Sequence, residues 1–151
     1  MVKLKLNTPP VKGYLHHAYL LSIAQEHPCF NEWFYSNYIQ LRYFPKNNWL
    51  NFHILYYYLL LDVQTISYNL IRINHIDIID FIINFINQGY YVWLYIDEYY
   101  DPNRISYNNK NLIHENMIYG YNITAKCFYT VGFDRKRIYS YNELNFSDFM
   151  N

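Results

Sequence analysis

A cysteine stands where a helix is expected to begin, and a thiol in that position can act as a nucleophile. Cys29 follows Pro28 and precedes an aromatic-rich segment, and proline is favoured in the first turn of a helix. The unpaired backbone N–H groups and the positive end of the helix dipole favour the thiolate, the nucleophilic form of cysteine. The commoner alternative is a buried cysteine that acts only as a small hydrophobic residue.

A thiol nucleophile needs a base and a group that orients the base. Among the six histidines, His114 opens a predicted strand over 111–119, and Asp134 follows a predicted strand over 124–133. The two positions lie 20 residues apart, so a hairpin with arms of about ten residues brings them to the same end of the sheet. We therefore predict a catalytic triad of Cys29, His114 and Asp134, with Asn122 as the reserve for the orienting group.

An oxyanion would need donors beside the thiol, and two are available in the sequence. The backbone N–H of Cys29 is one, and the side chain of Gln25, four residues earlier, is the candidate for the second. Gln25 also fits an ordinary solvated position before a helix break, and we favour that alternative slightly.

Tyr95, Asp97 and Glu98 form a weaker candidate site at the end of a predicted strand. The carboxylates could hold an amine or diamine acceptor, and a solvated loop after a strand is the plainer interpretation. No metal site is predicted, because His16 and His17 are adjacent and no HExxH or paired-cysteine motif occurs.

The apolar pattern predicts an α+β fold in which helices precede an antiparallel sheet and pack on one side of it. A helix over 28–43 is expected to be the central buried one, and Asn74 is expected to cap another. The glycine at 120 is assigned to a turn over 120–122, and residues 62–72 fit a strand or a connector equally well. We expect a single domain over 1–151 with an extended arm at 1–12. The other predicted helices span 13–26, 49–61 and 74–89, and the other predicted strands span 90–97 and 137–141.

The composition limits which kinds of partner and which cellular compartment are expected for this chain. Twelve basic and twelve acidic residues are scattered along the 151-residue chain, so nucleic acid is not expected as a partner. The longest apolar run, 54–61, is far shorter than the ~20 residues of a membrane span, and neither export nor membrane insertion is predicted. Two cysteines without a CxxC pair fit a reducing, cytoplasmic setting.

Aromatic residues make up 22% of the chain, and so many tyrosine hydroxyls cannot all be buried with partners. The excess predicts an aromatic-lined cleft or an interface, including that of a homodimer. Biased composition in a chain rich in Asn and Ile explains it equally well.

Four segments together resemble the papain-like superfamily, in particular the compact bacterial branch related to C39 peptidases and to the N-terminal domain of the butirosin-biosynthesis acyltransferases. They are HPCFNEWFYSNYIQL, INQGYYVWLYIDEYYDPN, IHENMIYGYN and FYTVGFD, and the similarity covers most of residues 14–134. The resemblance implies a papain-like fold with the nucleophile helix starting near residue 28, and it gives Cys29, His114 and Asp134 the roles of nucleophile, base and orienting group. The chain departs from the pattern at Gln25 and at Asn122, which ends the GYD-like turn.

The resemblance also implies a reaction. Members of this branch, including amide synthases of the closthioamide type, move acyl groups from carrier-protein thioesters to amines in natural-product biosynthesis. We therefore expect an acyltransferase that forms an acyl-enzyme on Cys29, takes its acyl group from the phosphopantetheine arm of a carrier protein, and needs no cofactor of its own. A cysteine peptidase that processes a peptide and a non-catalytic, aromatic-rich interaction module are the alternatives.

Overall fold

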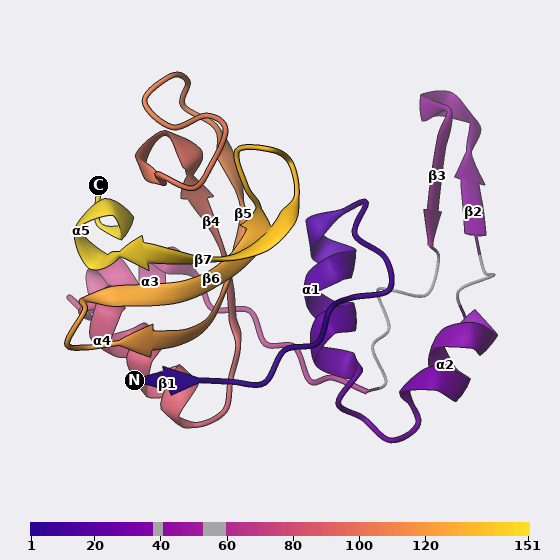
Figure 1. Ribbon diagram of the computed structural model, residues 1–151, viewed down its shortest axis with the longest axis horizontal. Coiled ribbons are helices and arrows are strands. Elements are labelled where there is room, and N and C mark those ends of the chain that lie inside the picture. Colours follow the sequence, from indigo (N-terminus) through magenta and orange to yellow (C-terminus); the bar gives the residue numbers. More distant parts are fainter. Residues whose placement is uncertain (38–40, 53–59) are drawn as a thin grey trace.

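The fold is α+β, as predicted, and is built on a curled antiparallel sheet (Figure 1). The structure is a computed structural model that describes residues 1–37, 41–52 and 60–151. Strand β5 lies at the centre of the sheet, with β6 on one side and both β1 and β4 on the other; β7 pairs with the outer side of β6. The strands are β1 Val2–Lys3, β4 Val92–Asp97, β5 Ile113–Asn122, β6 Cys127–Phe133 and β7 Tyr139–Asn145.

Helices cover both faces of this sheet, whereas the sequence predicted helices on one face only. Helix α1, Leu15–Ala24, packs through Tyr19 against Met117 and Val131. Helix α4, Ile78–Asn87, packs on the opposite face against the neighbouring Ile118. Successive residues of a strand point to opposite faces, so Met117 and Ile118 define the α1 face and the α4 face of the sheet.

Helix α4 is the best-predicted element, and its isoleucine stripe forms the core contact. Its cap is Asp77, whose Oδ1 accepts hydrogen bonds from the N–H groups of Ile79 (2.8 Å) and Asp80 (3.0 Å). Asn74 instead ends the preceding helix α3, Tyr68–Ile73, so the predicted capping box was misplaced by three residues. The short helix α5, Phe146–Phe149, packs its phenylalanines on Phe128 at the same face.

Gly120 lies inside β5, not in the predicted turn. A Cβ at this position would stand 2.4 Å from the carbonyl oxygen of Val2, because β1 pairs with β5 there. The glycine is therefore needed for the close approach of two strands. The turn follows at 123–126, where the side chain of Asn122 accepts a hydrogen bond from the N–H of Ala125 at 3.2 Å.

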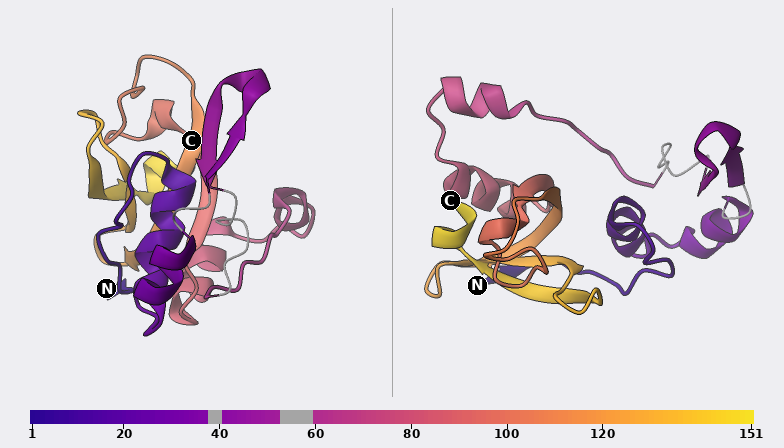
Figure 2. Two further views of the ribbon diagram at one scale, coloured as in Figure 1. Left: turned by 90° about the vertical axis from the view of Figure 1, so that its right-hand side faces the viewer. Right: turned by 90° about the horizontal axis from the view of Figure 1, so that it is seen from above.

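Only the first part of the predicted central helix over 28–43 is helical, and residues 38–40 of that range lie outside the described residues. Helix α2, Phe30–Asn37, is short, and strands β2, Leu41–Phe44, and β3, Trp49–Phe52, form a hairpin where further helix was expected. Residues 53–59 of the predicted helix 49–61 lie outside the described residues. Helix α2 and the hairpin sit beyond α1, on its side away from the sheet (Figures 1 and 2).

Candidate functional site

His114 is held by a buried glutamate at the start of β5. Its Nδ1 lies 2.8 Å from Oε1 of Glu98, which is only 5% exposed. The other oxygen of Glu98 accepts a hydrogen bond from Ser106 Oγ at 3.0 Å. The arrangement orients the imidazole as a carboxylate does in a base–orienter pair, and it identifies Glu98 as the partner of His114.

Asp134 lies at the same end of the sheet as His114, as the hairpin argument predicted, because the Met117–Val131 pair continues toward both positions. Its carboxylate, however, closes the turn before β7, where Oδ1 accepts from the N–H groups of Lys136 (2.8 Å) and Ile138 (2.9 Å). The structure therefore assigns Asp134 to the turn and does not place it on His114.

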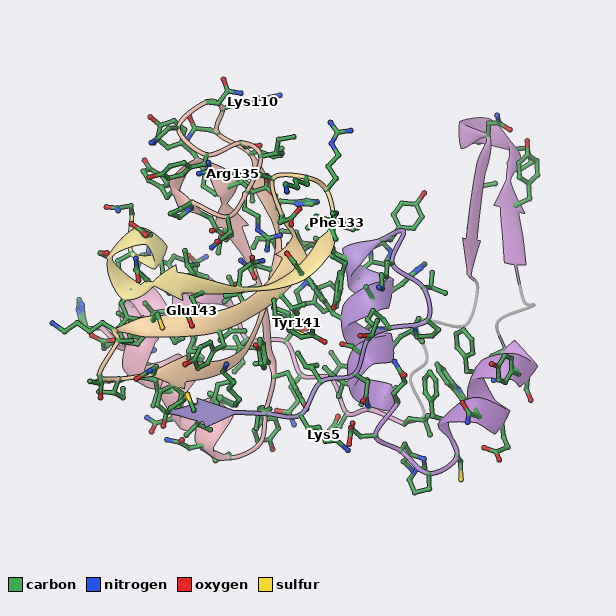
Figure 3. The ribbon with its side chains drawn as sticks, in the orientation of Figure 1. Lys5, Lys110, Phe133, Arg135, Tyr141 and Glu143 are labelled. Carbon is green, nitrogen blue, oxygen red and sulfur yellow. The ribbon has the colours of Figure 1, made fainter. Side chains whose placement is uncertain are left out.

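Cys29 is exposed and does not approach His114. Regular pairing with β4 sets the side chains of His114 and Ile118 on the α4 face of the sheet, whereas α1 covers the other face and separates the sheet from α2 (Figure 1). Lys110 and Arg135 mark the end of the sheet at which His114 lies, far from the start of α2 (Figure 3). Cys29 is thus separated from His114 and Asp134, and acyl transfer through the three residues stays a prediction without geometric support.

The predicted oxyanion donors are bonded elsewhere. The backbone N–H of Cys29 donates to Nδ1 of His27 at 3.1 Å. The amide of Gln25 donates to the carbonyl of Thr8 at 2.9 Å, which ties the end of α1 to the N-terminal segment.

Two histidines, and no cysteine, occupy the first turn of α1, the helix that packs on the sheet. His16 Nδ1 lies 3.8 Å from Oε2 of Glu115, and the hydroxyl of Tyr95 donates to Oε1 of the same glutamate at 3.4 Å. His17 is buried, and burial together with the charge of His16 lowers its pKa to about 4.

The acidic residues at the end of β4 and directly after it have separate structural roles. Asp97 accepts from the N–H groups of Tyr99 (3.0 Å) and Leu112 (2.9 Å) through Oδ1, and from Asn111 Nδ2 (2.6 Å) through Oδ2. These hydrogen bonds, that of Asn111 first, lower the pKa of Asp97. Glu98 holds His114 and the Tyr95 hydroxyl donates to Glu115, so all three residues predicted to bind an amine are engaged within the protein.

Asp101 is buried in an ion pair with Arg104, whose Nε lies 3.2 Å from Oδ2. The Nη1 of Arg104 also donates to the carbonyl of Phe133 at 2.6 Å. The guanidinium lies over Gly132, where a Cβ would stand 2.3 Å from Nη1. The pair thus attaches the loop that follows β4 to strand β6, and the positive charge of Arg104 cancels the negative charge of Asp101.

A cleft of about 520 Å³ opens between the edge of β4 and helices α3, α4 and α5. Its helical wall carries the aromatic residues Tyr68, Phe81, Phe85 and Phe149, and residues 92–97 of β4 form another wall. Tyr95 and Asp97 both line it, but Glu98 and His114 do not. Sequence reasoning treated α4 only as an isoleucine stripe; the signal it missed is the Phe81–Phe85 pair, one turn apart and outside that stripe.

Comparisons of the chain with protein-family models, with curated proteins and with solved structures found no match. In the described part of the chain, no helix is long and apolar enough to cross a membrane. Among the same residues, no group of three or more His, Cys, Asp or Glu side chains is placed to hold a metal ion. The function is therefore argued from the cleft and from the residues around it.

Proposed function

We propose that the protein binds a small apolar molecule in the cleft between β4 and helices α3, α4 and α5. The observation that supports the proposal is the cleft itself, with a volume of about 520 Å³ and an aromatic and aliphatic lining. Ligand sites are commonly concave, largely apolar and roughly 300–1,000 Å³ in volume. Ile78, Ile82 and Leu94 supply aliphatic contacts, and the aromatic rings supply large contact areas at a small cost in side-chain entropy.

Tyr68, an exposed aromatic residue outside the buried core, also has a role if the cleft binds a ligand. Tyr68 lines the cleft and is 69% exposed. Large exposed apolar groups that gather around a concavity commonly mark a binding site. A ligand in the cleft would cover this ring.

Tyr68→Ala tests the proposal, because an exposed side chain can be removed with little effect on folding. A neutral aromatic probe, 2-phenylethanol, should bind about fivefold more weakly to this variant, which corresponds to ~1 kcal/mol for one aromatic contact. Tyr35→Ala is the matched control, since Tyr35 lies on α2, is 71% exposed and does not line the cleft. Isothermal titration should show unchanged affinity for this control; equal losses in both variants, or no binding to the wild type, would contradict the proposal.

A further inference from the structure

We infer that the ligand of the cleft is a short peptide that pairs with β4 as an added strand and places apolar side chains against the helices. The inference rests on the proposed function, because it names the class of ligand for the same cleft. All residues of β4, Val92–Asp97, line the cleft, although the side chains of a strand alternate between two faces. What these residues share is the backbone edge of the strand, so the cleft runs along this edge.

This edge of β4 is unpaired in the described part of the chain. Strand β4 pairs there with β5 alone, and in the same register the N–H of Glu98 donates to the carbonyl of Leu112 at 2.9 Å. Main-chain groups alternate in direction along an antiparallel strand, so those of Trp93 and Tyr95 point away from β5. Their N–H and C=O groups have no hydrogen-bond partner among the described residues, and they face the cleft.

A second backbone in extended conformation matches these groups. Its N–H and C=O groups repeat every two residues, about 7 Å, as do those of Trp93 and Tyr95. An α-helix bonds its own main-chain groups internally and a hydrocarbon has none, so neither would satisfy the edge. Natural sheet edges are commonly protected by Lys, Pro or a bulge, but β4 contains neither Lys nor Pro, and its register with β5 is regular from Val92 to Asp97.

The two faces of β4 determine how the side chains of the peptide would lie. Residues that are paired across neighbouring strands share a face, and Leu94 packs on the core cluster of the α4 face. A peptide residue opposite Leu94 would therefore point toward the helical wall that carries Phe81 and Phe85. Peptide residues opposite Trp93 and Tyr95 would bond to β4 and point to the other face. The ligand is therefore expected to have apolar residues at every second position.

The probe is an acetylated and amidated pentapeptide, Val-Thr-Val-Thr-Val, whose valines would face the helices while its threonines bond to β4. In isothermal titrations, N-methylation of either threonine should weaken binding at least about tenfold, because it removes a donor and sets a methyl group against β4. N-methylation of the central valine is the matched control. It should change the affinity less than about twofold, because that N–H points away from β4. Equal losses would overturn the inferred strand pairing.

Tyr95→Pro and Tyr95→Ala test the same edge from the protein. Both remove the phenol, but only proline removes the N–H, and an edge strand tolerates proline where the N–H takes no part in the ladder. The peptide should bind at least about fivefold more weakly to Tyr95→Pro than to Tyr95→Ala, while 2-phenylethanol should bind both alike. Equal peptide binding would contradict the inference. If Tyr95→Pro does not fold, the N-methylated peptides still decide.

The remaining outcomes separate this inference from the proposed function. If 2-phenylethanol binds and the pentapeptide does not, the peptide inference fails and binding in the cleft stands; if neither binds, the proposed function fails as well. Sedimentation velocity without peptide tests whether a second copy of the chain pairs with β4 instead. A dimer of the wild type and of Tyr95→Ala that is absent in Tyr95→Pro would identify the second copy as the occupant and overturn the peptide inference.

Discussion

Acid should destabilise this protein through one buried histidine. His17 is 2% exposed, and burial, together with the charge of His16, lowers its pKa from 6.5 to about 4. Between these two values the unfolded chain binds a proton that the folded chain does not, so stability falls as the pH is lowered from 6.5 to 4 and levels off below. A shift of this size corresponds to about 3 kcal/mol, of which roughly 2.5 kcal/mol should be lost by pH 4.5.

Urea denaturation followed by circular dichroism at pH 7.5 and pH 4.5 measures this loss. His17→Gln removes the titrating group, so its free energy of unfolding should fall by about 2.5 kcal/mol less than that of the wild type over the same interval. His75→Asn is the control, because His75 is exposed with a positive φ of 52° that asparagine tolerates, and it should keep the wild-type dependence. The reasoning is refuted if wild type and His17→Gln lose the same stability between the two pH values.

Two further predictions follow from the buried ion pair and from the separated triad. Gly132→Ala should cost about 1–3 kcal/mol in urea denaturation, because its Cβ would force the buried Arg104 guanidinium to shift and weaken the hydrogen bond from Nη1 to the Phe133 carbonyl. Gly13→Ala, with open space around it, should change stability by less than about 0.5 kcal/mol, and equal effects would contradict the predicted role of Gly132. After incubation with acyl-phosphopantetheine thioesters, mass spectrometry should show the same amount of acyl adduct on Cys29 in the wild type and in His114→Ala. An adduct that forms in the wild type and is lost in His114→Ala would support the acyltransferase prediction.

The sequence predicted the second half of the fold better than the first. Helix α4 and strands β4, β5 and β6 have strong periodic patterns, and their pairing follows from short connections. Residues 28–52 carry aromatic side chains at spacings that fit a helix, yet aromatic residues fit a β-hairpin equally well, and the chain forms one at Leu41–Phe44 and Trp49–Phe52. Gly120 has a structural role that depends on β1, more than 100 residues earlier in the chain, so no local pattern could distinguish it from a turn glycine.

The candidate site was likewise predicted only in part. Strand pairing correctly predicted that His114 and Asp134 share one end of the sheet, but not which face His114 occupies. That face depends on which helices cover the sheet: α1 lies opposite, and α2, with Cys29 before it, lies beyond α1 (Figure 1). The partner of His114 is Glu98, the first residue after β4, and its contact with His114 distinguishes it from its acidic neighbours. The cleft combines three consecutive elements, α3, α4 and β4, with the distant helix α5, so it could not be predicted from the motif of any one of them.

The position of a bound aromatic probe tests the proposed binding cleft most directly. Intermolecular nuclear Overhauser effects between the ring protons of 2-phenylethanol and protein methyl groups report which surface the probe contacts. Cross-peaks to Ile78, Ile82 and Leu94, which line the cleft, are expected in the wild type, and weaker ones in Tyr68→Ala. Cross-peaks confined to methyl groups on the α1 face of the sheet, such as those of Leu15 and Val131, would contradict binding in the cleft.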